Sequence, residues 1–203
     1  LAGCGSGGGD GPVFVPATVQ ILSDPALDGD IELDSLGIFR VVQGMSPTVQ
    51  SVFAGIDLFT ESEFRAFLDF PLTGAVPGAA IIQTATLDIF LNNVQTLTPA
   101  NSIPIRIDLV DFQPPILLET DFSTTSLPAL ATVTIPIFQS DFGQHVLVDV
   151  TPLMLEAQRL GLLNFQVRIL LGLGVLSPAR IEINDTTGLD RGALAPLLDV
   201  VFF

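Results

Sequence analysis

The stretch that decides the fold is residues 64–91, FRAFLDFPLTGAVPGAAIIQTATLDIFL. Side chains alternate between two sets over residues 64–71, and they do so again over residues 84–91. A period of two places successive side chains on opposite faces of a β-strand. Gly74, Pro77 and Gly78 lie between the two runs and are typical turn residues. The stretch therefore predicts a strand, a loop and a second strand.

The rest of the chain repeats this pattern, with about ten short strands separated by turn residues. We therefore expect an all-β protein, an antiparallel β-sandwich of the jelly-roll-like kind, forming a single domain over residues 13–203. The apolar closing segment 197–203, LLDVVFF, is expected to pair inside the sheet, because a free apolar edge invites aggregation. One short capping helix is expected after Thr151, with Thr151 as N-cap, Pro152 in the first turn and Gly161 as its end.

The composition excludes some classes of partner. The chain has 22 acidic and 7 basic residues, a formal net charge of −15, and repulsion from phosphate argues against nucleic acid. It contains 15 Phe but neither Tyr nor Trp. Sugar sites often stack their ligand on Tyr or Trp, whose polar edges tolerate water. Their absence weakens a carbohydrate-binding interpretation.

The first four residues, Leu1-Ala2-Gly3-Cys4, resemble a bacterial lipobox, in which the Cys receives lipid. A Gly-rich segment follows directly, so residues 1–12 are interpreted as a lipobox remnant and a flexible tether. Cys4 is the only cysteine, so no disulfide can form within the chain. We expect lipid attachment at Cys4 and a place in the bacterial cell envelope, at the outer membrane or cell surface.

Several segments, in order, resemble the DNRLRE-type domains, β-sandwiches of bacterial surface and secreted proteins. That family has an Arg-led strand, a proline-glycine loop, an "AtL" strand, a "DVT" helix cap and a closing strand. The matching segments here are residues 65–70, 76–79, 84–87, 148–151, 165–168 and 181–185, followed by 196–203. The resemblance covers residues 30–203 and implies a sandwich with a non-catalytic role. Some relatives bind sugar, but Phe or Leu stands here where the family has Tyr and Trp.

An acidic segment is the best candidate for a metal site. Asp28, Asp30, Glu32 and Asp34, with Asp24 before them, could supply oxygen ligands to Ca²⁺, which takes about six to eight. An EF-hand is excluded, because Leu33 replaces the required Gly and Phe39 the closing Glu. The alternative is a solvated strand face. No other cofactor is expected.

Two further groups of polar residues are candidates for chemistry. Arg65, Arg168, Glu182 and Asp185 are interpreted as structural ion pairs tying the sandwich together, with a polar ligand site as the alternative. His145 is the only His; no nucleophile and acid accompany it, and one His with one Cys cannot supply a zinc site.

The sequence therefore favours a lipid-anchored, extracytoplasmic β-sandwich that acts as a surface, structural or protein-interaction module and is not an enzyme. The alternative is a carbohydrate-binding module at the cell surface. Possible partners are the membrane, through the lipid, and a polysaccharide, a protein or a second copy. An exposed concave face with Phe and amide side chains would favour the carbohydrate interpretation, and a wide apolar patch would favour protein contacts.

Overall fold

A computed structural model describes residues 15–44, 50–97, 102–113, 116–172 and 177–203. Twelve strands form one sheet, and every ladder in it is antiparallel. The strands are β1 (Ala17–Leu22), β2 (Gly29–Leu33), β3 (Phe39–Gln43), β4 (Ser51–Ile56), β5 (Glu63–Pro71), β6 (Ile82–Thr96), β7 (Ile103–Val110), β8 (Ala131–Ile137), β9 (His145–Asp149), β10 (Asn164–Leu171), β11 (Ala179–Asn184) and β12 (Leu197–Phe202). The all-β, antiparallel fold expected from the alternation is confirmed.

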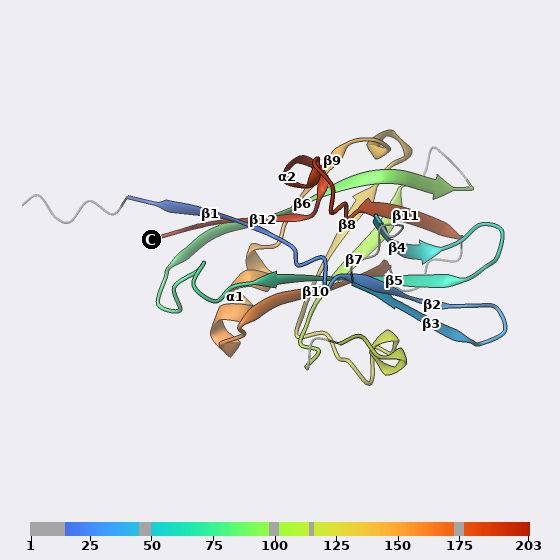
Figure 1. Cartoon of the computed structure of the whole chain (residues 1–203), viewed down its shortest axis with the longest axis horizontal. Helices are drawn as coiled ribbons and strands as arrows, with labels where there is room; N and C mark the ends of the chain where they lie inside the picture. Colours follow the sequence, from blue (N-terminus) through green and yellow to red (C-terminus); the bar gives the residue numbers. More distant parts are fainter. Residues whose placement is uncertain (1–14, 45–49, 98–101, 114–115, 173–176) are drawn as a thin grey trace, which may run out of the picture.

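The sheet curls so that its two halves face each other, as in a sandwich (Figure 1). Its order is β1-β12-β6-β11-β4-β5-β10-β7-β8, with β9 on β6 and the hairpin β2–β3 on β5. β4 and β5 join the halves at one corner. One apolar core fills the space between them and takes side chains from both, including Leu87, Ile183 and Leu198 from one half and Phe70 and Ile107 from the other.

The two strands of residues 64–91 lie in different halves of the sheet. β5 pairs with β10, β2 and β4, whereas β6 pairs with β12, β11 and β9. β6 keeps the expected alternation, with Ala85 and Leu87 buried between more exposed neighbours, but β5 is buried on both faces, because Phe67 packs into a second apolar cluster. The loop between them therefore carries the chain across the core.

The closing strand β12 pairs on both sides, with β1 and with β6. Leu198 and Val200 are fully buried in the core, and Phe202 packs against it. This confirms that the apolar segment is an interior strand of the sheet.

The helix α1 (Thr151–Leu160) forms where it was expected, and Gly161 ends it in the left-handed region at φ 69°. The expected role of Thr151 as N-cap is wrong. Its hydroxyl accepts the Ala85 N–H at 2.9 Å, which ties the helix to β6, while Asp149 Oδ1 accepts the Thr151 N–H at 2.9 Å. Short turns complete the fold: η1 (Glu119–Phe122), η2 (Gln139–Asp141) and α2 (Arg191–Leu194). In the described part of the chain, no helix is long and apolar enough to cross a membrane.

Candidate functional site: a polar cleft at the corner of the sheet

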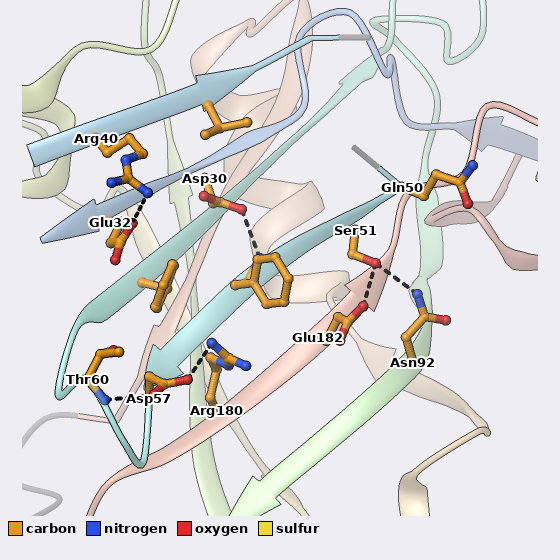
Figure 2. Close-up of a pocket in the computed structure, with 13 residues that line it drawn as sticks. Asp30, Glu32, Arg40, Gln50, Ser51, Asp57, Thr60, Asn92, Arg180 and Glu182 are labelled. Atoms are coloured by element: carbon orange, nitrogen blue, oxygen red, sulfur yellow. Dashed lines mark hydrogen bonds and ion pairs between the residues drawn. The ribbon is translucent and has the colours of Figure 1, made fainter. Parts of the chain in front are cut away.

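A cleft of about 710 Å³ opens between the hairpin β2–β3 and the strands β4, β6 and β11 (Figure 2). Its lining combines carboxylates, amides, guanidinium groups, hydroxyls and two Phe rings. The lining residues are Asp30, Glu32, Arg40, Val42, Gln50, Ser51, Phe53, Asp57, Thr60, Phe64, Asn92, Arg180 and Glu182. They come from segments far apart in the sequence, which the curl of the sheet brings to one corner.

The cleft forms because β4 pairs with β5 over a short distance only, and the two strands separate beyond that contact. β4 pairs with β11 along its length but with β5 only at Gly55 and Ile56. Gly55 has φ 115°, and a Cβ there would lie 2.1 Å from the Ala179 carbonyl oxygen, so the corner requires glycine. Further along β4, Asp30 Oδ2 of β2 accepts the Phe53 N–H at 3.2 Å. A carboxyl group therefore satisfies a backbone donor of β4 beyond the point where its pairing with β5 ends.

Both Arg side chains of the cleft already have carboxylate partners. Arg40 lies 3.3 Å from Glu32, and Arg180 lies 2.6 Å from Asp57. The Arg180 guanidinium also lies over the rings of Phe53 and Phe64, at 5.0 and 5.5 Å from their centroids. The cleft thus holds four carboxylate side chains, of which two are paired with its two guanidinium groups.

A chain of four polar side chains begins at the other end of the cleft, and Figure 2 shows the three of them that line it, Ser51, Asn92 and Glu182. Asn184 Nδ2 donates to Asn92 Oδ1 at 2.9 Å, Asn92 Nδ2 donates to Ser51 Oγ at 2.9 Å, and the Ser51 hydroxyl donates to Glu182 Oε1 at 2.8 Å. We call Asn184, Asn92, Ser51 and Glu182 the amide relay. A β-bulge makes it possible: Glu182 pairs with Asn93 and Ile183 with Leu91, so Asn92 is an extra residue of β6.

Asp30 is the most perturbed carboxyl group in the cleft. Its pKa is raised from 3.8 to about 7, mainly by burial and also by the nearby Glu32, while the Phe53 N–H and Arg180 oppose the shift. Only 5% of Asp30 is exposed. A cleft carboxyl group that titrates near neutrality marks this corner as a candidate functional site.

Asp30 should make the protein less stable as the pH rises. Between about pH 4 and 7 the folded state holds a proton that the unfolded state has released, so the free energy of unfolding falls through this window. At about 1.4 kcal/mol per pKa unit, the shift amounts to roughly 4 kcal/mol in total. Asp30→Asn should therefore flatten this part of the profile and stabilise the protein at pH 8, measured by urea unfolding at a series of pH values. Asp111→Asn, at an exposed position, is the control and should leave the profile unchanged; an unaltered slope in Asp30→Asn would contradict the assignment.

The four carboxylates expected to bind calcium do not converge on one point. Asp28 accepts the Asp69 N–H at 2.8 Å, while Asp30 and Glu32 line the cleft. Asp34 accepts the N–H groups of Leu36 and Ile38 in the turn between β2 and β3. Within the described ranges, no three His, Cys, Asp or Glu side chains gather as a metal group would.

The residues interpreted as ion pairs find other partners than one another. Arg65 lies 2.7 Å from Glu63, and Arg168 lies 2.8 Å from Asp108. Glu182 belongs to the amide relay. Asp185 lies 3.9 Å from Arg191 and contacts Asp28, and burial raises the pKa of both Asp28 and Asp185. Three of the four residues therefore form ion pairs, but with partners outside the set, because the strand register places each group beside a different neighbour.

Of the two other sequence candidates, His145 is described and does not line the cleft. His145 begins β9, where its Nδ1 lies 2.9 Å from Asp88 Oδ1 and its ring packs edge-on against Phe90. Cys4 lies outside the described residues.

Sequence reasoning missed the residues that β4, β6 and β11 bring to the cleft, namely Ser51, Phe53, Asn92 and Arg180. One local signal was present. The run Leu91-Asn92-Asn93-Val94 breaks the apolar alternation of β6 with two consecutive polar residues, as a bulge does.

Comparison with known proteins adds little to this description. No family model matches the sequence, and no curated protein matches it. Among solved structures there is a match to a rhamnosidase from Klebsiella oxytoca with rhamnose bound, at 10% identity and a TM-score of 0.35. The match covers 83% of this chain and 29% of that protein, so the chain spans less than a third of its length. A likeness this distant carries no argument about fold or function.

Proposed function

We propose that this protein is a non-catalytic module that binds a polyhydroxylated ligand, a glycan, in the cleft at the β4–β5 corner. The observation that carries the proposal is the composition of the lining. Ionisable carboxyl groups accept hydrogen bonds from hydroxyl groups, and amides and guanidinium groups donate to hydroxyl oxygens. Phe53 and Phe64, both partly exposed, supply apolar surface between these polar groups. Such a mixture suits the alternating polar rim and apolar faces of a sugar ring.

Other ligand classes fit the cleft less well. Its carboxylates outnumber its guanidinium groups, and both guanidinium groups are engaged, so a phosphate or another anion would meet net negative charge. A purely apolar ligand would leave the carboxylates and amides without partners. A neutral ligand with many hydroxyl groups satisfies both kinds of group.

The protein-interaction role favoured by the sequence has less support than the cleft. The large apolar side chains exposed in the described residues occur singly, as do Phe59 before β5 and Leu147 on β9, or in pairs close in the sequence, such as Leu36 with Ile38 and Phe138 with Phe142. Docking surfaces usually gather such side chains in one patch. The concave polar site is therefore the better basis for a function.

Attachment to the cell envelope through Cys4 remains part of the proposal, supported by the lipobox-like start and the Gly-rich segment after it. Cells expressing the protein with a complete signal peptide should incorporate labelled fatty acid into it, and Cys4→Ala should abolish the label. Equal labelling of both forms would rule out lipid at this position.

The binding role predicts a measurable affinity for at least one glycan on an array, confirmed by calorimetry. Glu182→Gln should weaken that binding by roughly tenfold or more, the size expected for a hydrogen bond to a charged group. Glu119→Gln makes the same chemical change on the exposed turn η1 and should bind like wild type. Chromatography of the glycan after incubation should show no shortened products.

Two results would contradict this function. One is the absence of binding to any glycan of a broad array. The other is cleavage of the bound glycan, which would make Asp30 and its neighbours catalytic and the protein an enzyme.

A further inference from the structure

The amide relay has a definite direction, and this can be derived from its buried end. Asn184 Oδ1 accepts the backbone N–H of Thr186 at 2.9 Å. A backbone N–H can only donate, so the oxygen of the Asn184 amide must face Thr186 and its nitrogen must face Asn92. The hydrogen-bond network thus settles which way the Asn184 amide is turned, which the shape of the amide alone does not.

The orientation of Asn184 in turn determines which groups of Asn92 and Ser51 donate and which accept. Because Asn184 donates, Asn92 must present its oxygen to Asn184 and its nitrogen to Ser51. Ser51 Oγ accepts that bond, so its single hydrogen is directed to Glu182 Oε1. Each member has one role, and a backbone amide outside the cleft lining sets the direction of all of them.

The relay determines what its cleft end offers a ligand. The Ser51 hydroxyl donates to one oxygen of Glu182, and an ionised carboxylate is a pure acceptor with a second oxygen beyond the relay. Asn92 turns its nitrogen toward the same point, and a primary amide has a second N–H beyond the one given to Ser51. The Glu182 carboxylate, an acceptor, and the Asn92 amide, a donor, are therefore neighbours that both contact the Ser51 hydroxyl.

We propose that this pair recognises two neighbouring hydroxyl groups of a neutral sugar, with Glu182 accepting from one and Asn92 donating to the other, and that Asn184 is the positioning residue that keeps them so oriented. This deepens the proposed function and rests on it. A uronate sugar is disfavoured, because its carboxylate would approach Glu182 and the other acidic groups of the cleft. Asn184 itself is only 8% exposed and does not line the cleft, so it acts through Asn92.

The variant that tests the relay is Asn184→Asp. Its carboxylate can still accept the Thr186 N–H, so the turn after β11 is retained. The carboxylate cannot donate, however, so the Asn92 amide should rotate by half a turn. Its nitrogen would then donate to the new carboxylate, and its oxygen would face Ser51. The Ser51 hydroxyl would then donate to Asn92 and no longer to Glu182. Gln113→Glu makes the same amide-to-carboxylate change at an exposed residue that does not line the cleft, and is the control.

The first measurement needs no ligand. In side-chain NMR spectra, Asn184→Asp should shift the Asn92 amide resonances and the Ser51 hydroxyl proton, whereas Gln113→Glu should leave their hydrogen-bond pattern unchanged. Unshifted Asn92 and Ser51 signals in Asn184→Asp would overturn the relay, whatever the protein binds.

The second measurement is binding to neutral manno- and galacto-oligosaccharides and to uronate oligosaccharides. Wild type should prefer the neutral set, and Asn184→Asp should bind it about tenfold more weakly, while Gln113→Glu stays within about threefold of wild type. Equal losses in the two variants, or a preference for uronates, would overturn the assignment of the hydroxyl pair. If wild type binds no glycan, the proposed function and the ligand assignment fall together, and the NMR result still decides the relay.

Discussion

Replacing Arg168 with Met is expected to lower the free energy of unfolding by about 3–5 kcal/mol, the usual cost of leaving one partner of a buried ion pair without the other. Arg168 and Asp108 are both fully buried, and Arg168 Nη2 donates to Asp108 Oδ2 at 2.8 Å. Arg168 Nη1 also donates to the Leu127 carbonyl at 2.9 Å and the Asp121 carbonyl at 3.2 Å. The side chain therefore holds the segment after β7 against β10, and its loss leaves several buried acceptors without a donor.

Asp108 retains two other partners in this variant, which places the expected loss toward the lower end of that range. Arg106 Nε lies 2.5 Å from Asp108 Oδ1, and the Thr132 hydroxyl donates to the same oxygen at 2.7 Å. The double variant Arg168→Met with Asp108→Leu should recover part of the stability, because it removes the buried charge as well. Urea unfolding measures both variants. A single variant that loses less than about 1 kcal/mol would show that Arg168 is dispensable.

The amino-acid sequence is sufficient to predict the strands, because burial on one face imposes the period of two. Ala85 and Leu87 in β6, and Leu198 and Val200 in β12, are buried as the alternation requires, whereas β5 is buried on both faces. The helix α1 could be placed by Pro152 and Gly161, whose backbone preferences are local. The capping role of Thr151 could not, because its hydroxyl bonds to Ala85, which is 66 residues away in the sequence.

The candidate site depends on register and on a bulge, and neither is fixed by local pattern. Asp30 and Glu32 could be placed on one face of β2 from their spacing, but not opposite Phe53 or beside Arg180. Arg168 could be recognised as a buried cation in need of a carboxylate, yet the partner is Asp108, which β7 places directly opposite it in the ladder. Long-range pairing decides which polar groups meet, and a single sequence leaves it open.

Removing residues 195–203 is expected to abolish folding and give insoluble protein. β12 lies between β1 and β6, and β1 has no other strand partner among the described residues, so the deletion exposes the edge of β6 and detaches β1. The deleted segment also takes Leu198 and Val200 out of the core, and each large apolar side chain contributes about 1.5–3 kcal/mol by burial. Two apolar edges would then be open to other chains.

A milder change separates the loss of packing from the loss of the strand. Leu198→Ala should cost about 2–5 kcal/mol, because Leu198 is fully buried and its removal leaves a cavity in the core. Leu189→Ala makes the same substitution at a fully exposed position and should change stability by less than about 0.5 kcal/mol. Thermal unfolding and sedimentation compare the three variants with wild type. If the truncated protein is soluble and melts near the wild-type temperature, β12 is an appendage and the two halves of the sheet hold together without it.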